Sequence, residues 1–291
     1  MPPRNDATHN KLFRWLFFLK QDSTQRLAKA ISNAGICSRR DAELLIKNSE
    51  VKVNGVIIDS PATLVDNTSL IEVSGKLINQ QQTPRLWAYY KPVGLITSHK
   101  DNYGRKTVFE SLASNQSSSQ NDIYSSERSV VNLREYANAP KFCGANSQEQ
   151  KSMPRVISIG RLDLNSEGLL LLTNNGDLAR KFELPSSKLE RIYKVRSHGN
   201  PNLLLKNYKN IEIDQIRYDP KSIKLTKSGK TNCWFEVILT EGKNREIRKI
   251  FEYFGLSVNR LIRISYGGFL LGDLQPNQYK ELPLEKFKKF L

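Results

Sequence analysis

The segment GRLDLNSEGLLLLTNNG, residues 160–176, combines an Arg-Leu-Asp triplet, four consecutive leucines and an Asn-Asn-Gly turn. Leu169 to Leu172 form a short apolar run bounded by turn residues, which is typical of a buried strand. A carboxylate, Asp163, precedes this strand, and the nearest cation in the sequence is Arg161. An isolated Asp after a short strand is more often a turn or capping residue than a catalyst. Its role therefore depends on its surroundings.

The patterns on both sides of this segment predict an α+β fold. The expected strands are 86–91, 155–160, 168–174, 193–198 and 232–242, and the expected helices are 177–184 and 244–255. Strands and helices do not alternate regularly, so we expect a largely antiparallel mixed sheet with flanking helices.

The N-terminal part predicts a small module of two helices and a hairpin. The first helix ends at Gly35, as a C-terminal glycine favours. Ser38, with Asp41 three residues later, is a variant of the capping box that begins a second helix. Two β-branched runs then flank Asn54-Gly55, a strong hairpin signal.

The composition favours a polyanionic partner. The chain has 291 residues, with 45 Lys and Arg against 29 Asp and Glu, so its formal net charge is +16. Because the positive charge is spread along the chain, nucleic acid is favoured over a membrane surface. Cys37, Cys143 and Cys233 are far apart and the three histidines form no cluster, so we expect no disulfide framework, no metal site and a cytoplasmic protein.

Composition also divides the chain. We expect an N-terminal extension at 1–21, flexible and too short in its apolar part to span a membrane. The further divisions are the small helical module at 22–78, a polar linker at 79–85 and a larger domain at 86–285. A stretch rich in Ser, Asn and Gln interrupts the last domain at about 113–153, and we expect it to be a disordered insertion.

The stretch RLAKAISNAGICSRRDAELLIKNSEVKVNG, residues 26–55, closely resembles the S-four-like RNA-binding module first described in a small-subunit ribosomal protein. The resemblance implies that the helix pair and the following turn contact RNA phosphates. The residues expected to do so are Arg26, Arg39, Arg40 and Lys52. Without the resemblance, these side chains are equally compatible with an ordinary solvated face.

Five further stretches resemble, in order, the motifs of bacterial ribosomal RNA pseudouridine synthases of the RsuA family. They are YYKPVGLITS (89–98), VISIGRLD with GLLLLTNNGDLA (156–179), ERIYKV (190–195), ILTEGKNREIRKIF (238–251) and RLIRISYGGFLLGDL (260–274). The resemblance covers nearly all of 22–285 apart from the insertion. Ser166 replaces the usual Thr and keeps its hydroxyl, and Asn175 stands where Asp is frequent.

The resemblance implies that Asp163 is catalytic, as a nucleophile or as a base and electrostatic partner. It implies that Tyr193 stacks on the uracil and that Arg248 is the cation partner of Asp163. Helical spacing places Arg248 on the flank of the apolar stripe of 244–255, from which its guanidinium could reach a cleft or solvent. The reaction of this family, the isomerisation of uridine to pseudouridine, involves no redox change or energy input, so we expect no cofactor.

The remaining cations are expected to contact RNA. Lys91 resembles a structural or RNA-backbone element rather than a catalyst. Arg161, Lys243, Arg245 and Lys249 are expected phosphate contacts, with solvated surface as the alternative for the last three.

These observations predict an enzyme that converts a specific uridine of ribosomal RNA to pseudouridine after the nucleotide is flipped out. Large-subunit RNA is slightly favoured, ribosomal assembly intermediates are possible further partners, and a monomer is expected. One alternative is a non-catalytic RNA-binding or ribosome-assembly factor. Another is a nucleoside hydrolase, which would need a second acid, and Glu167 is the only nearby candidate.

Overall fold

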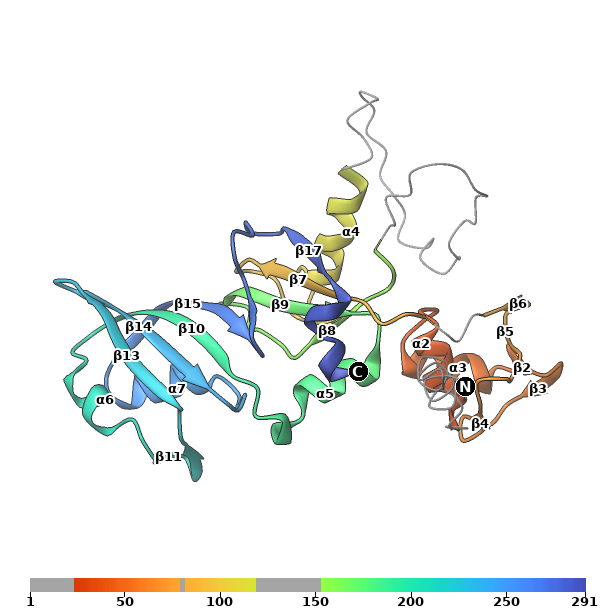
Figure 1. Cartoon of the computed structure of the whole chain (residues 1–291), viewed down its shortest axis with the longest axis horizontal. Helices are drawn as coiled ribbons and strands as arrows, with labels where there is room; N and C mark the ends of the chain where they lie inside the picture. The colour runs from red at the N-terminus through yellow and green to blue at the C-terminus, as the bar shows by residue number, and fades with distance from the viewer. Residues whose placement is uncertain (1–23, 79–81, 119–152) are drawn as a thin grey trace, which may run out of the picture. The chain divides into compact units, whose positions relative to one another are not determined.

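The computed structural model describes residues 24–78, 82–118 and 153–291. The chain divides into two compact units, with the boundary between Pro84 and Arg85 (Figure 1). The extension predicted at 1–21 and most of the insertion predicted at 113–153 lie outside the described residues. None of the helices that are described is long and apolar enough to cross a membrane.

The first unit packs two helices against short strands, as the sequence predicted. Its elements are β1 (Gln25–Arg26), α2 (Leu27–Asn33), α3 (Arg39–Lys47), β2 (Val51–Val53), β3 (Val56–Ile58), β4 (Leu64–Val65), β5 (Ile71–Val73) and β6 (Lys76–Leu77). Leu27, Ile31, Ala42 and Ile46 from the two helices are fully buried in its core. The pairings β1–β4, β2–β5 and β5–β6 were not predicted.

The predicted local signals of this unit are confirmed. The Ser38 hydroxyl accepts a hydrogen bond from the backbone N–H of Asp41 at 3.2 Å and donates to its carboxylate at 2.7 Å, so α3 begins at Arg39. Asn54 and Gly55 both have positive φ, 51° and 81°, as a tight two-residue hairpin turn requires. The exposed face of this unit carries the side chains of Arg26, Arg39, Arg40 and Lys52.

The second unit is built on a mixed sheet. Its described strands are β7 (Leu86–Lys91), β8 (Ile157–Ile159), β9 (Glu167–Thr173), β10 (Arg191–His198), β13 (Ser222–Ser228), β14 (Asn232–Leu239), β15 (Ser257–Tyr266), β16 (Phe269–Leu270) and β17 (Tyr279–Leu282). The main order is β13-β14-β10-β15-β9-β7-β17, with β8 on β9 and β16 on β15. Only β9 and β15 pair in parallel in this sheet, so the predicted α+β fold is confirmed.

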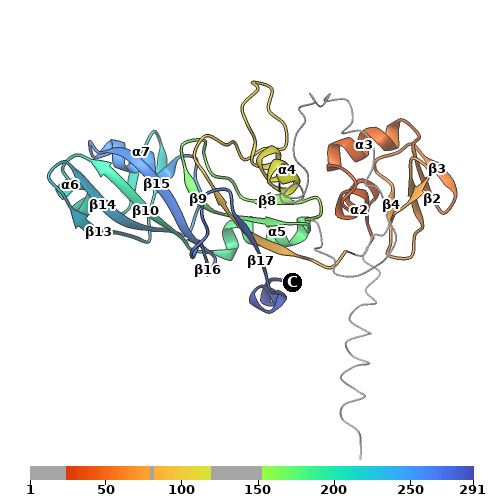
Figure 2. The same ribbon diagram turned by 90° about the horizontal axis from the view of Figure 1, so that it is seen from above.

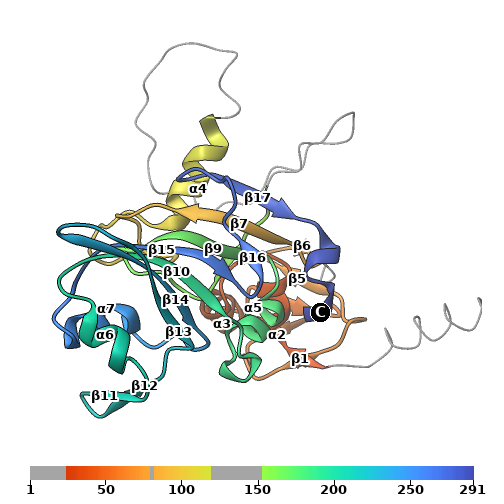
Figure 3. The same ribbon diagram turned by 60° about the vertical axis from the view of Figure 1, so that its left-hand side comes forward.

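The four leucines of β9 alternate between two apolar layers. Leu170 and Leu172 belong to the core under α4 (Val108–Ser118) and α7 (Glu246–Tyr253), whereas Leu169 and Leu171 pack with α5 (Gly176–Glu183). Figures 1 and 3 show α4 and α5 on opposite sides of β7 and β9. Successive side chains of a strand point to opposite faces, so this apolar run fills both layers at once.

The two strongest predicted helices are found, and others were missed. Helices α5 and α7 match the predictions at 177–184 and 244–255, and α7 lies across the sheet half that contains β10, β14 and β15 (Figure 2). Helix α6 (Asn202–Asn207) and the hairpin of β11 (Ile211–Ile213) with β12 (Ile216–Tyr218) were not predicted. Helix α4 extends through 113–118, which the sequence assigned to the insertion. Buried Val108 and Leu112 anchor this helix.

Candidate active site

A cleft of about 1160 Å³ opens within the second unit. Its wall is formed by the 96–105 loop, the segment from Ser158 to Ser166, strands β10 and β15, and the segment from Leu239 to Ile247. The sequence motifs quoted above therefore converge on one space, although they are distributed over more than 150 residues of chain. Asp163 and Tyr193 both line this cleft.

Asp163 lies in the loop that leads into β9 and is half-buried. Among the described residues, its carboxylate forms no hydrogen bond or ion pair. Its backbone is held instead, because its carbonyl oxygen accepts from the N–H of Ser166 at 3.0 Å. The next residue, Leu164, accepts from the N–H of Gly94 at 2.9 Å. The loop thus fixes the position of Asp163 and leaves its carboxylate available to a ligand.

The Lys91 side chain holds this loop in place through hydrogen bonds. It is fully buried, and its ammonium donates to the carbonyl oxygens of Pro92 at 3.0 Å, Asp163 at 3.1 Å and Ser166 at 2.8 Å. Burial lowers the pKa of Lys91 to about 8, although the negative charges of Asp163 and Glu167 act to raise it. These three carbonyl oxygens match the three ammonium hydrogens, which favours the structural alternative predicted for Lys91 over an RNA contact.

Arg248 also binds this loop rather than the Asp163 carboxylate. One guanidinium nitrogen, Nη2, donates to the carbonyl oxygen of Asn165 at 2.7 Å, and Nη1 donates to that of Val258 at 3.0 Å. Burial and the charge of Arg245 lower the pKa of Arg248, and the charge of Asp163 raises it. Asp163 is therefore an electrostatic neighbour of Arg248 without a direct ion pair, and its role as the charge partner of Arg248 stays a prediction. The backbone acceptors lie closer than the carboxylate does.

Tyr193 is held on the floor of the cleft by its place in β10. Its side chain is buried, and its neighbours in the adjacent strands are Val237 of β14 and Arg263 of β15. Residues directly opposite each other project to the same face of a sheet. The ring of Tyr193 and the guanidinium of Arg263 therefore share the face that lines the cleft.

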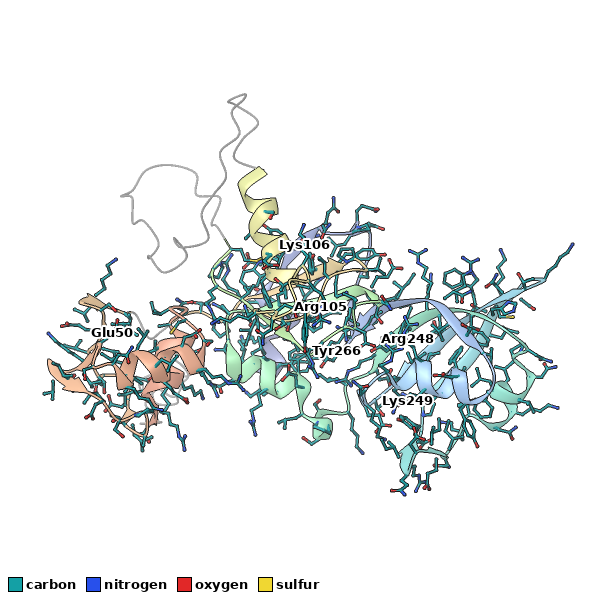
Figure 4. The ribbon with its side chains drawn as sticks, turned by 180° about the vertical axis from the view of Figure 1, so that it is seen from behind. Glu50, Arg105, Lys106, Arg248, Lys249 and Tyr266 are labelled. Atoms are coloured by element: carbon teal, nitrogen blue, oxygen red, sulfur yellow. The ribbon has the colours of Figure 1, made fainter. Side chains whose placement is uncertain are left out.

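The sequence analysis missed two cleft arginines, Arg191 and Arg263. Arg263 is 2% exposed and donates from Nε to the carbonyl oxygen of Leu169 at 2.7 Å. Arg191 is paired across the strands with Tyr266 and donates to its hydroxyl at 3.1 Å (Figure 4 labels Tyr266). Both arginines lay within stretches already quoted. Arg191 lies two residues before Tyr193, and Arg263 lies two residues after Leu261. Side chains two residues apart in a strand share a face, and this spacing was the available signal.

The four other predicted RNA contacts of this unit differ in position. Arg161 and Arg245 are exposed and line the cleft. Lys243 also lines it, but its ammonium is bound to the Glu241 carboxylate at 2.6 Å and to the carbonyl oxygen of Arg217 at 2.5 Å. Lys249 is half-buried on α7, beside Arg248, and is not part of the cleft wall (Figure 4).

Two acids near the cleft have contrasting environments. Glu167 accepts from the Tyr90 hydroxyl at 2.8 Å and from Arg260 at 2.6 Å, so it is held as a structural anion. Glu246 is buried in the cleft wall, and burial, followed by the charge of Glu241, raises its pKa to about 7. One of its oxygens accepts from the backbone N–H of Lys243 at 3.2 Å.

No cluster of three or more His, Cys, Asp or Glu side chains suited to a metal ion occurs in the described ranges 24–78, 82–118 and 153–291. Of the three cysteines, Cys37 is half-buried and Cys233 is buried, and Cys143 lies outside these ranges.

Comparison with known proteins identifies two protein families in this chain. The family described as RNA pseudouridylate synthase matches residues 85–253, and the S4 domain matches residues 25–70. The chain is 60% identical over 259 residues to an uncharacterized RNA pseudouridine synthase of Rickettsia felis, covering 89% of this chain and 96% of that protein. It is 33% identical to the ribosomal large subunit pseudouridine synthase B of Haemophilus influenzae, covering 90% and 65%.

A solved structure shares the fold. A crystal structure of a pseudouridylate synthase superimposes with a TM-score of 0.52 at 20% identity, covering 91% of this chain and 99% of that one. The family matches, the relatives and the two-unit organisation agree with one another. The chain belongs to the RNA pseudouridylate synthase family, as an RNA pseudouridine synthase with an N-terminal S4 domain.

Proposed function

We propose that this protein converts a uridine of ribosomal RNA to pseudouridine, with Asp163 as the catalytic residue. The observation that carries the proposal is the state of the Asp163 carboxylate. It lines the cleft without a hydrogen bond or ion pair among the described residues, while Lys91 and Arg248 both hold the backbone of its loop. A carboxylate held in place but left unpaired is suited to act on a substrate.

The chemistry assigns a role to each group. The glycosidic bond from C1′ to N1 of uracil breaks, the base turns and a bond forms from C1′ to C5. C5 then loses its proton to a base and N1 takes up a proton, so that the product is an isomer of the substrate. Asp163 acts on the sugar as nucleophile or on its C2′ proton as base, and both routes use the same unpaired carboxylate. Tyr193, which lines the same cleft, holds the detached uracil by stacking, and its phenol assists removal of the C5 proton.

Ribosomal RNA is proposed from the relatives. Two proteins described as ribosomal large subunit pseudouridine synthase B, from Haemophilus influenzae and Salmonella typhi, are 33% and 34% identical to this chain. Their name favours a uridine of the large subunit. The net charge of +16 and the exposed cations of the first unit suit binding to RNA phosphates. The bacterial cytoplasm, where ribosomes are assembled, is the proposed location, and a monomer is the proposed state.

Mapping of pseudouridines in ribosomal RNA tests the proposal. RNA from a deletion strain, complemented with wild type or with Asp163→Ala, is treated with carbodiimide and read by primer extension. We expect wild type to restore at least one missing modification and Asp163→Ala to restore none. Restoration by the variant would remove Asp163 from the catalytic role. A deletion strain that lacks no ribosomal pseudouridine would instead refute the substrate.

A further inference from the structure

The cleft face of β10 and β15 carries two guanidinium groups that have no role in the reaction proposed for Asp163. Arg191 and Arg263 lie on neighbouring strands and both contact the ring of Tyr266. Their guanidinium carbons lie 4.6 Å and 5.0 Å from the centre of that ring. The aromatic ring stabilises both cations but neutralises neither.

Arg263 is a buried cation without a carboxylate partner in the described part of the chain. It is 2% exposed, its Nε is bound to the carbonyl oxygen of Leu169, and its Nη2 is buried with no hydrogen-bond partner. An unpaired charge in such a place costs free energy in the unliganded protein. The cost is lowered if an anion enters the cleft, which the Arg263 side chain lines, and compensates the guanidinium charge.

Arg191 is held rigidly beside it. Its Nη1 donates to the carbonyl oxygens of Leu189 at 3.1 Å and Thr240 at 3.3 Å, and its Nη2 donates to the Tyr266 hydroxyl. The cleft wall also holds the acids Asp101, Asp163, Glu183, Glu241 and Glu246. Glu183 accepts from the N–H of Gly160 at 2.7 Å, and Glu241 is paired with Lys243 at 2.6 Å. Among the described residues, none of these carboxylates forms an ion pair with Arg191 or Arg263.

We propose that Arg263 and Arg191 bind the phosphate group adjoining the flipped uridine. This inference rests on the proposed function, because it places the target nucleotide in the cleft beside Asp163. Arg263 lies directly across the strands from Tyr193, the platform for the uracil. A nucleotide that stacks there brings its own phosphate into the same cleft. The planar fork of a guanidinium suits two oxygens of a phosphate, and binding would compensate the buried charge of Arg263 together with the half-buried charge of Arg191.

Phosphate substitution in the RNA tests the contact. The probe is a stem-loop containing the mapped uridine, with one uncharged methylphosphonate on its 5′ or its 3′ side. Dissociation constants are measured in an Asp163→Asn background, so that the uridine is not consumed. One of the two substitutions should weaken binding about 10- to 100-fold. The same substitution should change binding by Arg263→Gln no more than about twofold, because that contact is already lost.

Controls separate this contact from other effects. A methylphosphonate three nucleotides away should cost the same in all proteins. Arg191→Gln, at a less buried site, should reproduce part of the loss and provides the comparison if Arg263→Gln does not fold. Equal losses in the parent and both variants, or no loss in the parent from either flanking substitution, would overturn the proposal. A failure of the proposed function is seen separately, as pseudouridine formation by Asp163→Asn.

Discussion

The buried ammonium of Lys91 donates a hydrogen bond of 3.1 Å to the backbone carbonyl oxygen of Asp163. Strand β7, the first strand of the second unit, is thereby joined to the loop that bears the candidate catalytic residue, 72 positions later in the chain. The bond leaves the carboxylate of Asp163 free and fixes only its backbone. Lys91 and Arg248 thus act together on one loop, from β7 and from α7.

Replacing Lys91 with Met should loosen this loop. One buried and two part-buried carbonyl oxygens lose their donor, which we expect to lower the free energy of unfolding by about 2 kcal/mol or more. Turnover should fall while RNA affinity changes little, because the ammonium is fully buried. Urea denaturation and single-turnover assays measure the two effects. The matched control is Lys52→Met, an exposed lysine, with an expected change within about 0.5 kcal/mol. A Lys91→Met protein as stable and active as wild type would contradict this role.

Asp163→Asn should abolish turnover without weakening binding. The substitution keeps the shape and the backbone contacts of the loop but removes the negative charge that the reaction uses. We expect pseudouridine formation, followed by tritium release from C5-labelled RNA, to fall below detection. RNA affinity should stay within a few-fold of wild type. A loss of affinity equal to the loss of turnover would instead indicate that Asp163 organises the binding surface.

Gly168→Ala should disrupt the contact between β9 and β15. Gly168 has a φ of 103°, and an added Cβ would lie 2.3 Å from the carbonyl oxygen of Arg263. We expect a loss of about 4 kcal/mol or more in the free energy of unfolding, or failure to fold. The control is Gly272→Ala, at a φ of 59° with no atom within 4 Å, where only backbone strain remains. That substitution should cost about 1 kcal/mol. Similar costs for the two would show that the strands can separate.

Glu246 should make stability fall as pH rises. Its pKa is raised to about 7 in the folded protein, mainly by burial, so the folded state holds a proton that the unfolded state has released. Between pH 5 and 7 the folded form is therefore the more protonated, and each unit of pH should remove up to about 1.4 kcal/mol. Glu246→Gln should flatten this dependence in urea denaturation from pH 5 to 8. An unchanged slope in that variant would assign the effect to another group.

RNA binding should depend strongly on salt. Each phosphate contact releases a counterion, so the logarithm of the association constant should fall linearly with the logarithm of salt concentration. Arg39→Gln, on the exposed face of the first unit, should reduce the slope by about 0.7 to 0.9 if it contacts one phosphate. Lys91→Met should leave the slope unchanged, since its ammonium is bound to carbonyl oxygens. A flat plot for wild type would contradict a phosphate-binding surface.

Local sequence was enough to predict the elements that depend on local chemistry. Ser38 with Asp41 begins a helix, and Asn54-Gly55 makes a hairpin, because both effects act within a few residues. The leucines of β9 were identified as a buried strand for a similar reason. Their run has no polar interruption, and a strand covered on both faces needs none. Helix α4 was missed because its polar residues resemble those of the insertion that follows.

The amino-acid sequence by itself determined the fold class, the family motifs and Asp163 as the candidate catalyst. Only the tertiary structure decided what each buried cation contacts. Lys91 and Arg248 bind backbone carbonyl oxygens, which every residue carries and no pattern of side chains can single out. Arg263 is buried because β15 lies parallel to β9, and that pairing joins segments almost 100 residues apart. The sequence identifies the charged residues, but which groups they contact depends on how the strands pair in the folded protein.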